Sequence, residues 1–134
     1  TAEYVQAGIS DRPGRVRKVG DVTSVDALVE RLGLKHIHVL HSDIQGFEDS
    51  MLKGASKALA AGIIDYIFIS THSQALHEGC RATLQSAGFE IIADADMNET
   101  YSFDGLLVGK RTGVAGPDRV PISRRSTAAT TAAV

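Results

Sequence analysis

Two hydrophobic patterns alternate along this chain. Short runs that are nearly all apolar, or in which apolar and polar residues alternate, are typical of β-strands, and longer stretches with apolar residues three or four apart are typical of helices. The patterns predict strands at residues 3–9, 15–19, 37–40, 63–70, 89–93 and 103–109, and helices at residues 23–33, 47–61 and 73–87. Strands that alternate with helices indicate an α/β fold in which helices cover a largely parallel sheet.

Capping residues mark the ends of the expected helices. Thr23 and Ser73 stand where a hydroxyl can accept from the first free N–H groups of a helix. Gly33, Gly62 and Gly88 stand where the three helices end, and glycine readily takes the left-handed conformation that stops a helix. We therefore expect Thr23 to cap the first helix and Ser73 to cap the last.

The last two expected strands are joined by residues 94–102, a stretch too short to hold a crossover helix. Two strands joined in this way pair antiparallel. The fold class that we expect is α/β, with a mostly parallel sheet and an antiparallel last strand. Beyond Arg111 the chain is poor in large apolar residues and follows neither period. We expect residues 1–111 to fold as one unit and residues 112–134 to form a flexible low-complexity tail.

Composition and charge narrow the range of functions. The 134 residues are 43% hydrophobic, which suits a single domain with its own core. The 14 basic and 16 acidic residues give a formal net charge of -2, so we expect neither a nucleic-acid partner nor a membrane partner. Cys80 is the only cysteine, which excludes an intrachain disulfide and fits a cytoplasmic location.

The sequence also lacks several common signatures. It contains no Gly-x-Gly-x-x-Gly motif and no P-loop motif, so it has no dinucleotide or P-loop fingerprint of its own. No apolar run is long enough to span a membrane, and no signal peptide is recognisable. The chain starts at Thr1, directly in a strand-like segment, which we interpret as a piece of something longer.

Polar residues with catalytic potential follow two consecutive strands. His41 and Asp43 come at the end of the strand at 37–40, and His72 follows the strand at 63–70. In open α/β sheets, ligands bind outside the carboxyl ends of the strands. If these two strands are neighbours, their ends lie roughly 5 Å apart. We then expect His41, Asp43 and His72 to face one pocket.

Each of these residues also has a structural interpretation. Asp43 can act as a general base, orient a hydroxyl or bind a cation, and it can equally cap the helix that follows. Either histidine can transfer a proton near neutral pH or fill a structural position. A carboxylate with two imidazoles can also bind a metal, although the spacing does not require one. We expect His77 on the surface and Cys80 in the core.

Four segments of the chain together resemble one known family. EYVQAGISDRPGRV, TSVDALVERLGL, HSDIQGFEDSMLKGA and YSFDGLLVGKR occur in this order. They are similar to the carboxyl-terminal half of the FkbM family of S-adenosylmethionine-dependent methyltransferases, and the resemblance covers residues 3–111. Its most specific part, DIQGFEDSMLKGA, is similar to the family's Asp-x-Glu-Gly-x-Glu signature. Gln45 and His41 stand where the family usually has Glu and Lys.

The resemblance implies an incomplete Rossmann-like sheet and the transfer of a methyl group from S-adenosylmethionine to a hydroxyl of a small molecule or sugar. By resemblance, Gly8 and Ile9 lie beside the adenine of the cofactor, and Asp43 lies near the methyl group and the acceptor. In the family, a glycine-rich loop and an acidic ribose-binding residue follow the first two strands, and neither feature is present in this sequence ahead of the strand that begins near Thr1. We therefore expect this chain to bind the cofactor weakly or not at all and to be inactive alone.

These arguments assign catalytic or substrate-binding roles to six residues and leave two other functions open. The expected catalytic residues are Asp43, His41 and His72, and the expected substrate-binding residues are Gln45, Glu48 and Thr71, with no metal required. One alternative is a non-catalytic α/β interaction domain whose incomplete sheet edge pairs with a partner or with a second copy. The other alternative is a metal-dependent hydrolase that uses the same three expected catalytic residues.

Overall fold

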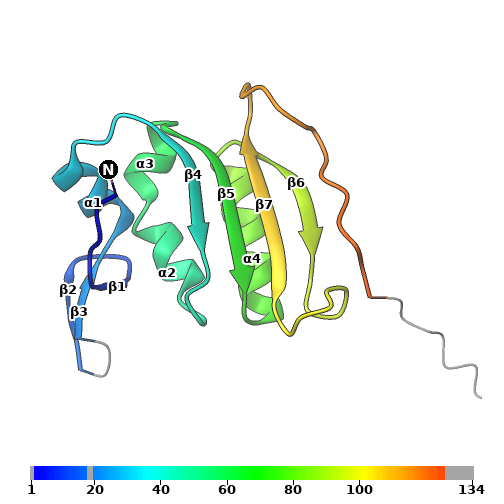
Figure 1. Cartoon of the computed structure of the whole chain (residues 1–134), viewed down its shortest axis with the longest axis horizontal. Coiled ribbons are helices and arrows are strands. Elements are labelled where there is room, and N and C mark those ends of the chain that lie inside the picture. Colours follow the sequence, from blue (N-terminus) through cyan, green and yellow to red (C-terminus); the bar gives the residue numbers. More distant parts are fainter. Residues whose placement is uncertain (1, 18–19, 126–134) are drawn as a thin grey trace, which may run out of the picture.

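The computed structural model describes residues 2–17 and 20–125, and within these ranges the chain forms two open sheets (Figure 1). The smaller sheet has the strand order β1 (Gly8–Ile9), β3 (Gly20–Thr23), β2 (Gly14–Val16). The larger sheet has the strand order β4 (Ile37–Ser42), β5 (Ile64–Thr71), β7 (Gly105–Arg111), β6 (Phe89–Ala95). The expected α/β class is confirmed.

The strand directions agree in part with the expected mostly parallel sheet. β4 and β5 pair in parallel, as do β1 and β3. β7 is antiparallel to both β5 and β6, and β2 is antiparallel to β3. Both sheets are therefore partly parallel. The last strand of the chain is reversed, as predicted, and it lies between β5 and β6 rather than at an edge.

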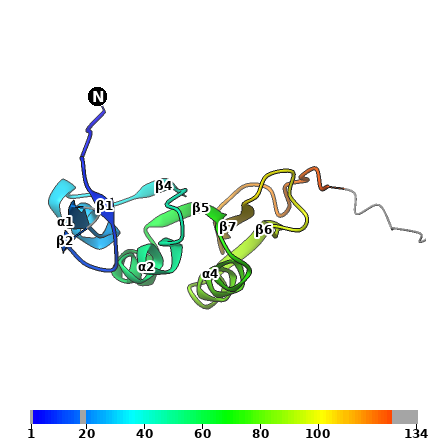
Figure 2. The ribbon, with the colours of Figure 1, turned by 90° about the horizontal axis from the view of Figure 1, so that it is seen from below.

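Helices cover one face of the larger sheet. The helices of the described ranges are α1 (Val25–Leu32), α2 (Glu48–Lys53), α3 (Ser56–Ala60) and α4 (Gln74–Ser86). Figure 2 shows α2 and α4 on the same side of the sheet. The largest fully buried apolar side chains of the main core are Met51, Leu52, Ile64, Ile67, Ile69, Leu84 and Leu107. Across the described part of the chain, no helix is long and apolar enough to cross a membrane.

The start of the first helix differs from the expectation by one residue. Ser24, not Thr23, is the cap, because its extended backbone lets the hydroxyl accept from Ala27 N at 3.2 Å. Thr23 is instead the last residue of β3. The cap at Ser73 and the left-handed stop at Gly33 are confirmed.

The single helix expected at residues 47–61 is two short helices. α2 ends at the cap residue Gly54, and α3 starts two residues later. The Asp26 carboxylate accepts from Lys57 N and Ala58 N, both at 2.9 Å. These are free N–H groups at the start of α3, so a side chain from α1 stabilises the new helix start.

The amino-terminal strands are the part that the hydrophobic pattern describes least well. The expected strand at 3–9 is a strand only at Gly8–Ile9, and the expected strand at 15–19 is Gly14–Val16, with residues 18–19 outside the described ranges. The pattern missed β3, in which only Val22 is a buried apolar residue. A strand with one buried side chain shows no period.

Residues 112–125, which we call the C-terminal strap, run along the outer side of β6 (Figure 1). Val120 N donates to Ile92 O at 2.7 Å, and Lys110 Nζ pairs with Asp118 at 2.8 Å. The hydrogen bond from Lys110 lowers the pKa of the Asp118 carboxyl. Residues 126–134 lie outside the described ranges, and the expected flexibility of residues 112–134 stays a prediction.

Gly54 allows the helices to pack against the amino-terminal segment. A Cβ at this position would meet the Ser10 carbonyl oxygen and would lie 2.9 Å from the Ser24 Cβ. We expect Gly54→Ala to lower the free energy of unfolding by about 1–3 kcal/mol, because the backbone of the neighbouring segment must move. Urea denaturation measures this change.

Gly79→Ala is the matched control for this prediction. Gly79 lies inside α4, and a Cβ there would have nothing within 4 Å. Alanine is the better helix former, so we expect this change to raise the free energy of unfolding by about 0.5–1 kcal/mol. Equal effects of the two substitutions would contradict the steric argument.

Candidate functional site

The larger sheet brings the turn after β4 next to the end of β5. His72 follows the last residue of β5, and parallel pairing aligns Ser42 with Ile69. His72 Nε2 lies 3.2 Å from Asp43 Oδ1 and 3.0 Å from Gln45 Nε2. The two strand ends therefore meet as expected, and the structure brings Asp43, Gln45 and His72 together.

Glu48 fixes the His72 ring from its buried side. Its carboxylate is 0% exposed, and Oε1 accepts from His72 Nδ1 at 2.7 Å and from Gly46 N at 3.0 Å. The Gln45 amide nitrogen can only donate, so His72 Nε2 accepts from it and, in the neutral ring, Nδ1 carries the proton that Glu48 accepts. Glu48 Oε2 is buried and has no hydrogen-bond partner among the described residues. Its expected contact with substrate stays a prediction.

Gln45 has a strained backbone at the centre of the turn. Its φ is 54°, and it is the one non-glycine residue with positive φ in the described ranges. This conformation costs roughly 1–2 kcal/mol for a residue with a Cβ. The Gln45 side-chain amide donates to His72 Nε2, so the strained turn is tied to the imidazole. Strain of this kind persists only where surrounding contacts fix it.

A third carboxylate approaches the imidazole, at the same nitrogen as Asp43. Asp104 Oδ1 lies 3.6 Å from His72 Nε2, and the side chains of Asp43 and Asp104 are both partly open to solvent. The sequence pattern did not single out Asp104. Pairing of Thr71 with Gly105 places it, because Asp104 is the residue before β7 and His72 is the residue after β5.

An apolar cavity of about 360 Å³ adjoins the turn. It lies between β1 and the turn, and its lining includes Gly8, Ile9, Val22, Ile44, Gln45 and Phe47. The two expected adenine-facing residues, Gly8 and Ile9, therefore line the same cavity as Gln45. Gln45 separates this apolar space from the His72 imidazole, which its amide contacts.

The structure does not bring His41 into this cluster. His41 lies within β4, exposed to solvent, and pairs with Phe68, four residues before His72 on β5. Among the described residues, no hydrogen bond or ion pair joins His41 to Asp43 or His72. The strand continues two residues further than expected, so His41 comes before the turn rather than in it.

Thr71 and His77 form a buried network below the site. Thr71 is fully buried, and its Oγ1 lies 2.7 Å from His77 Nδ1, so its side chain does not face the solvent side of the cluster. His77 Nε2 lies 2.9 Å from Asp94 Oδ1, which Arg81 also contacts. The expectation that His77 lies on the surface is wrong, because this helix position faces the sheet.

Two other kinds of chemistry find no support in the geometry. Within residues 2–17 and 20–125, no group of three or more His, Cys, Asp or Glu side chains has the arrangement of a metal site. Cys80 is buried in the core, as expected, and burial together with the charge of Glu48 raises the pKa of its thiol to about 12. A thiol with this pKa has almost no thiolate near neutral pH, so Cys80 is not poised as a nucleophile.

The chain matches a known protein family. The sequence model described as the methyltransferase FkbM domain matches residues 4–91, which include both sides of the apolar cavity, the turn after β4 and His72. The match ends before Asp104. Neither a curated protein nor a solved structure matches the chain.

Replacing Glu48 tests whether it holds the His72 ring. We expect Glu48→Gln to lower the free energy of unfolding by about 1–3 kcal/mol, because a charged acceptor of a buried hydrogen bond is lost. We also expect the His72 ring nitrogens to shift in ¹⁵N NMR spectra, because Nδ1 loses its charged partner. Urea denaturation and the NMR spectra measure the two effects.

Glu78→Gln provides the control, since Glu78 is exposed on α4 and lies away from the cluster. We expect it to change stability by less than about 0.5 kcal/mol and to leave the His72 signals in place. The assignment of Glu48 fails if both variants behave alike.

Proposed function

Because this chain belongs to the FkbM methyltransferase family, we propose that it forms part of an S-adenosylmethionine-dependent methyltransferase that acts on a hydroxyl of a small molecule or sugar. One observation carries the proposal. The His72 imidazole is held by the buried Glu48, and its Nε2, which accepts from the Gln45 amide, faces Asp43 beside the apolar cavity. This arrangement suits a general base that sits next to a bound cofactor.

The residues of the apolar cavity fit one end of the cofactor. Adenine is flat and largely apolar on its faces, and the cavity is walled by Val22, Ile44 and Phe47, with Gly8 and Ile9 also in its lining. These residues would hold the adenine. When bound, S-adenosylmethionine supplies an electrophilic methyl group on a sulfonium sulfur. The Gln45 side of the cavity leads to His72, which suits transfer near Asp43.

The chain's own residues then handle the acceptor proton. Methyl transfer to a hydroxyl needs alignment of the acceptor and removal of its proton. His72 Nε2 takes the proton after the Gln45 amide has moved aside, and the carboxylates of Asp43 and Glu48 stabilise the imidazolium that forms. Asp43, whose Oδ1 lies 3.2 Å from Nε2, helps to orient the imidazole toward the acceptor hydroxyl. We propose that His72 is the base, that Asp43 positions it, and that His41 has no separate role as a base.

The topology of the larger sheet supports the proposed Rossmann-like relationship. β4, β5 and β6 share one direction, and β7 is inserted between β5 and β6 in the opposite direction. We propose that this sheet is the carboxyl-terminal part of a Rossmann-like methyltransferase domain. A cytoplasmic location stays part of the proposal.

The bare edge of β4 favours a second candidate function. Among the described strands β4 pairs only with β5, and Val39 on it is 54% exposed. The strand carries no lysine, proline or acidic residue that would block pairing with another chain. The second candidate is therefore an interaction domain that pairs through this edge with a partner or with a second copy. The cofactor measurement below distinguishes it from a methyltransferase.

Binding of S-adenosylhomocysteine tests the cofactor side. We expect millimolar ligand to shift the NMR amide signals of Gly8, Ile9 and Gln45, and we expect Phe47→Ala to weaken the effect several-fold because Phe47 walls the cavity. Val39→Ala is the control, since Val39 is an exposed apolar residue on β4 that does not line the cavity. The cofactor proposal is overturned if the folded chain shows no shifts and a version extended upstream by about half a domain does not bind either.

Turnover tests the role of His72. The assay measures S-adenosylhomocysteine released from S-adenosylmethionine in the presence of a panel of sugars and small alcohols, with this chain and with the extended version. We expect His72→Gln to lower kcat by about 10²–10⁴-fold, the usual contribution of a general base. His38→Gln is the control, because His38 is exposed on β4. Equal rates for the two variants would remove His72 from the mechanism.

A further inference from the structure

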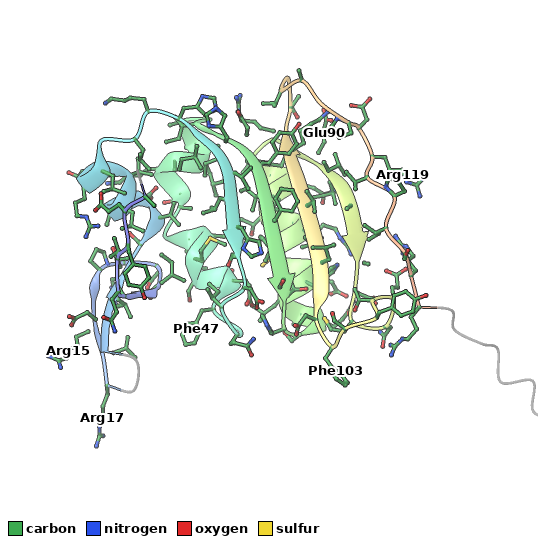
Figure 3. All side chains as sticks on the ribbon, viewed as in Figure 1. Arg15, Arg17, Phe47, Glu90, Phe103 and Arg119 are labelled. Carbon is green, nitrogen blue, oxygen red and sulfur yellow. The ribbon has the colours of Figure 1, made fainter. Side chains whose placement is uncertain are left out.

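The connection between β6 and β7 forms one side of the proposed acceptor site. Residues 96–104, here called the β6–β7 loop, end at Asp104, whose Oδ1 is 3.6 Å from His72 Nε2. The loop exposes two aromatic side chains, Tyr101 at 73% and Phe103 at 97%. Figure 3 shows Phe103 at the same edge of the molecule as Phe47. Exposed rings beside a base and a carboxylate are suited to contact a bound acceptor.

Two arginines of the C-terminal strap hold this loop. Arg125 donates from its backbone N to Glu99 O at 2.7 Å, and its guanidinium donates to Asn98 O at 3.1 Å and to Met97 O at 3.3 Å. Arg124 donates to Asp94 O at 2.7 Å and forms an ion pair with Glu99. We call Arg124 and Arg125 the arginine clamp.

These contacts go mainly to backbone carbonyls, which fix the path of the loop. A guanidinium is always charged and presents several donors in one plane, so it can bind successive carbonyl oxygens at once. Ion pairs between exposed side chains are worth little on their own. Hydrogen bonds to Met97 O and Asn98 O constrain the loop backbone itself, and the bond to Asp94 O ties the strap to the end of β6. Within the loop, the Thr100 hydroxyl donates to Asp104 O at 2.6 Å and so connects the clamped part to Asp104.

The C-terminal strap is anchored to the larger sheet before it reaches the β6–β7 loop. Val120 N bonds to Ile92 O, and Ile122 packs against the second apolar cluster, which contains Ile92 and Val108. A cavity of about 290 Å³ then lies between the strap and the loop, and its lining includes Ser70, Tyr101, Asp104 and Ser123. Asp104 thus borders both this cavity and the His72 imidazole. Figure 1 shows the strap ending at the side of the sheet where the loop lies.

We propose that Arg124 and Arg125 are positioning residues for the acceptor. They hold the β6–β7 loop so that Asp104 and the hydroxyl-lined cavity keep a fixed place beside His72. The proposal rests on the proposed function of His72 as the base. The family match ends at residue 91, so the loop and the clamp both lie outside it. They are therefore elements through which this chain can select its own acceptor.

The double variant Arg124→Ala/Arg125→Ala tests the clamp on the full chain, without cofactor or acceptor. We expect amide hydrogen exchange at residues 96–104 to become at least several-fold faster, while exchange in α1 stays unchanged. We also expect the His72 ring signals to move at fixed pH in the direction produced by Asp104→Asn, since both changes remove the Asp104 carboxylate from the imidazole. Arg119→Ala is the matched control, because Arg119 lies on the strap and points away from the sheet (Figure 3).

The outcomes separate a positioning role from a merely structural one. Unchanged exchange at residues 96–104 would overturn the clamp. Faster exchange without movement of the His72 signals would overturn the positioning role, because the loop would then be held without effect on the site. Both readouts are independent of methyl transfer, so a failure of the proposed function is distinguishable from a failure of the clamp. With a version of the chain that shows turnover, the double variant should raise the KM for the acceptor several-fold and leave the affinity for S-adenosylhomocysteine unchanged.

Discussion

The buried carboxylate of Glu48 is the constraint on which the candidate site depends. A carboxylate taken out of water is costly unless donors surround it, and a buried charge that loses its partner destabilises a fold strongly. Glu48 obtains its donors from Gly46 N and from His72 Nδ1. The start of α2, the turn after β4 and the end of β5 must therefore stay together. The same constraint leaves His72 Nε2 facing outward, and it supports the strained backbone of Gln45.

The fold was predictable where a hydrophobic period is set by the core. The helices that pack on the larger sheet, and strands β4 to β7, lie close to where the pattern placed them, because one of their faces is buried. The pattern failed where tertiary contacts decide the backbone. The helix break at Gly54 depends on the Asp26 carboxylate, and β3 depends on pairing with two segments that have little apolar surface. Local sequence carries no signal for either contact.

The site was predictable only as far as strand ends could be located. Asp43 and His72 meet because parallel neighbours end at the same edge of a sheet. His41 is excluded by two extra residues of β4, a small error in a strand end that moves a side chain out of the turn. Asp104 could not be found without the insertion of β7 between β5 and β6. His77 is buried because Gly105 leaves room for it: a Cβ there would lie 2.7 Å from His77 Nδ1.

The imidazole of His72 lies between two parts of the chain whose conformations are fixed by different interactions. On one side, Gln45 and the apolar cavity come from the segment that the family match covers, and their form follows from burial and from a tight turn. On the other side, Asp104 comes from an exposed loop, whose path is set by hydrogen bonds from the strap and within the loop rather than by the core. A surface loop held by polar contacts can change its side chains at little cost to the fold, whereas a buried turn cannot. In the function that we propose, this division would let the side that binds the methyl donor stay fixed while the side that binds the acceptor varies, with His72 as the base between them.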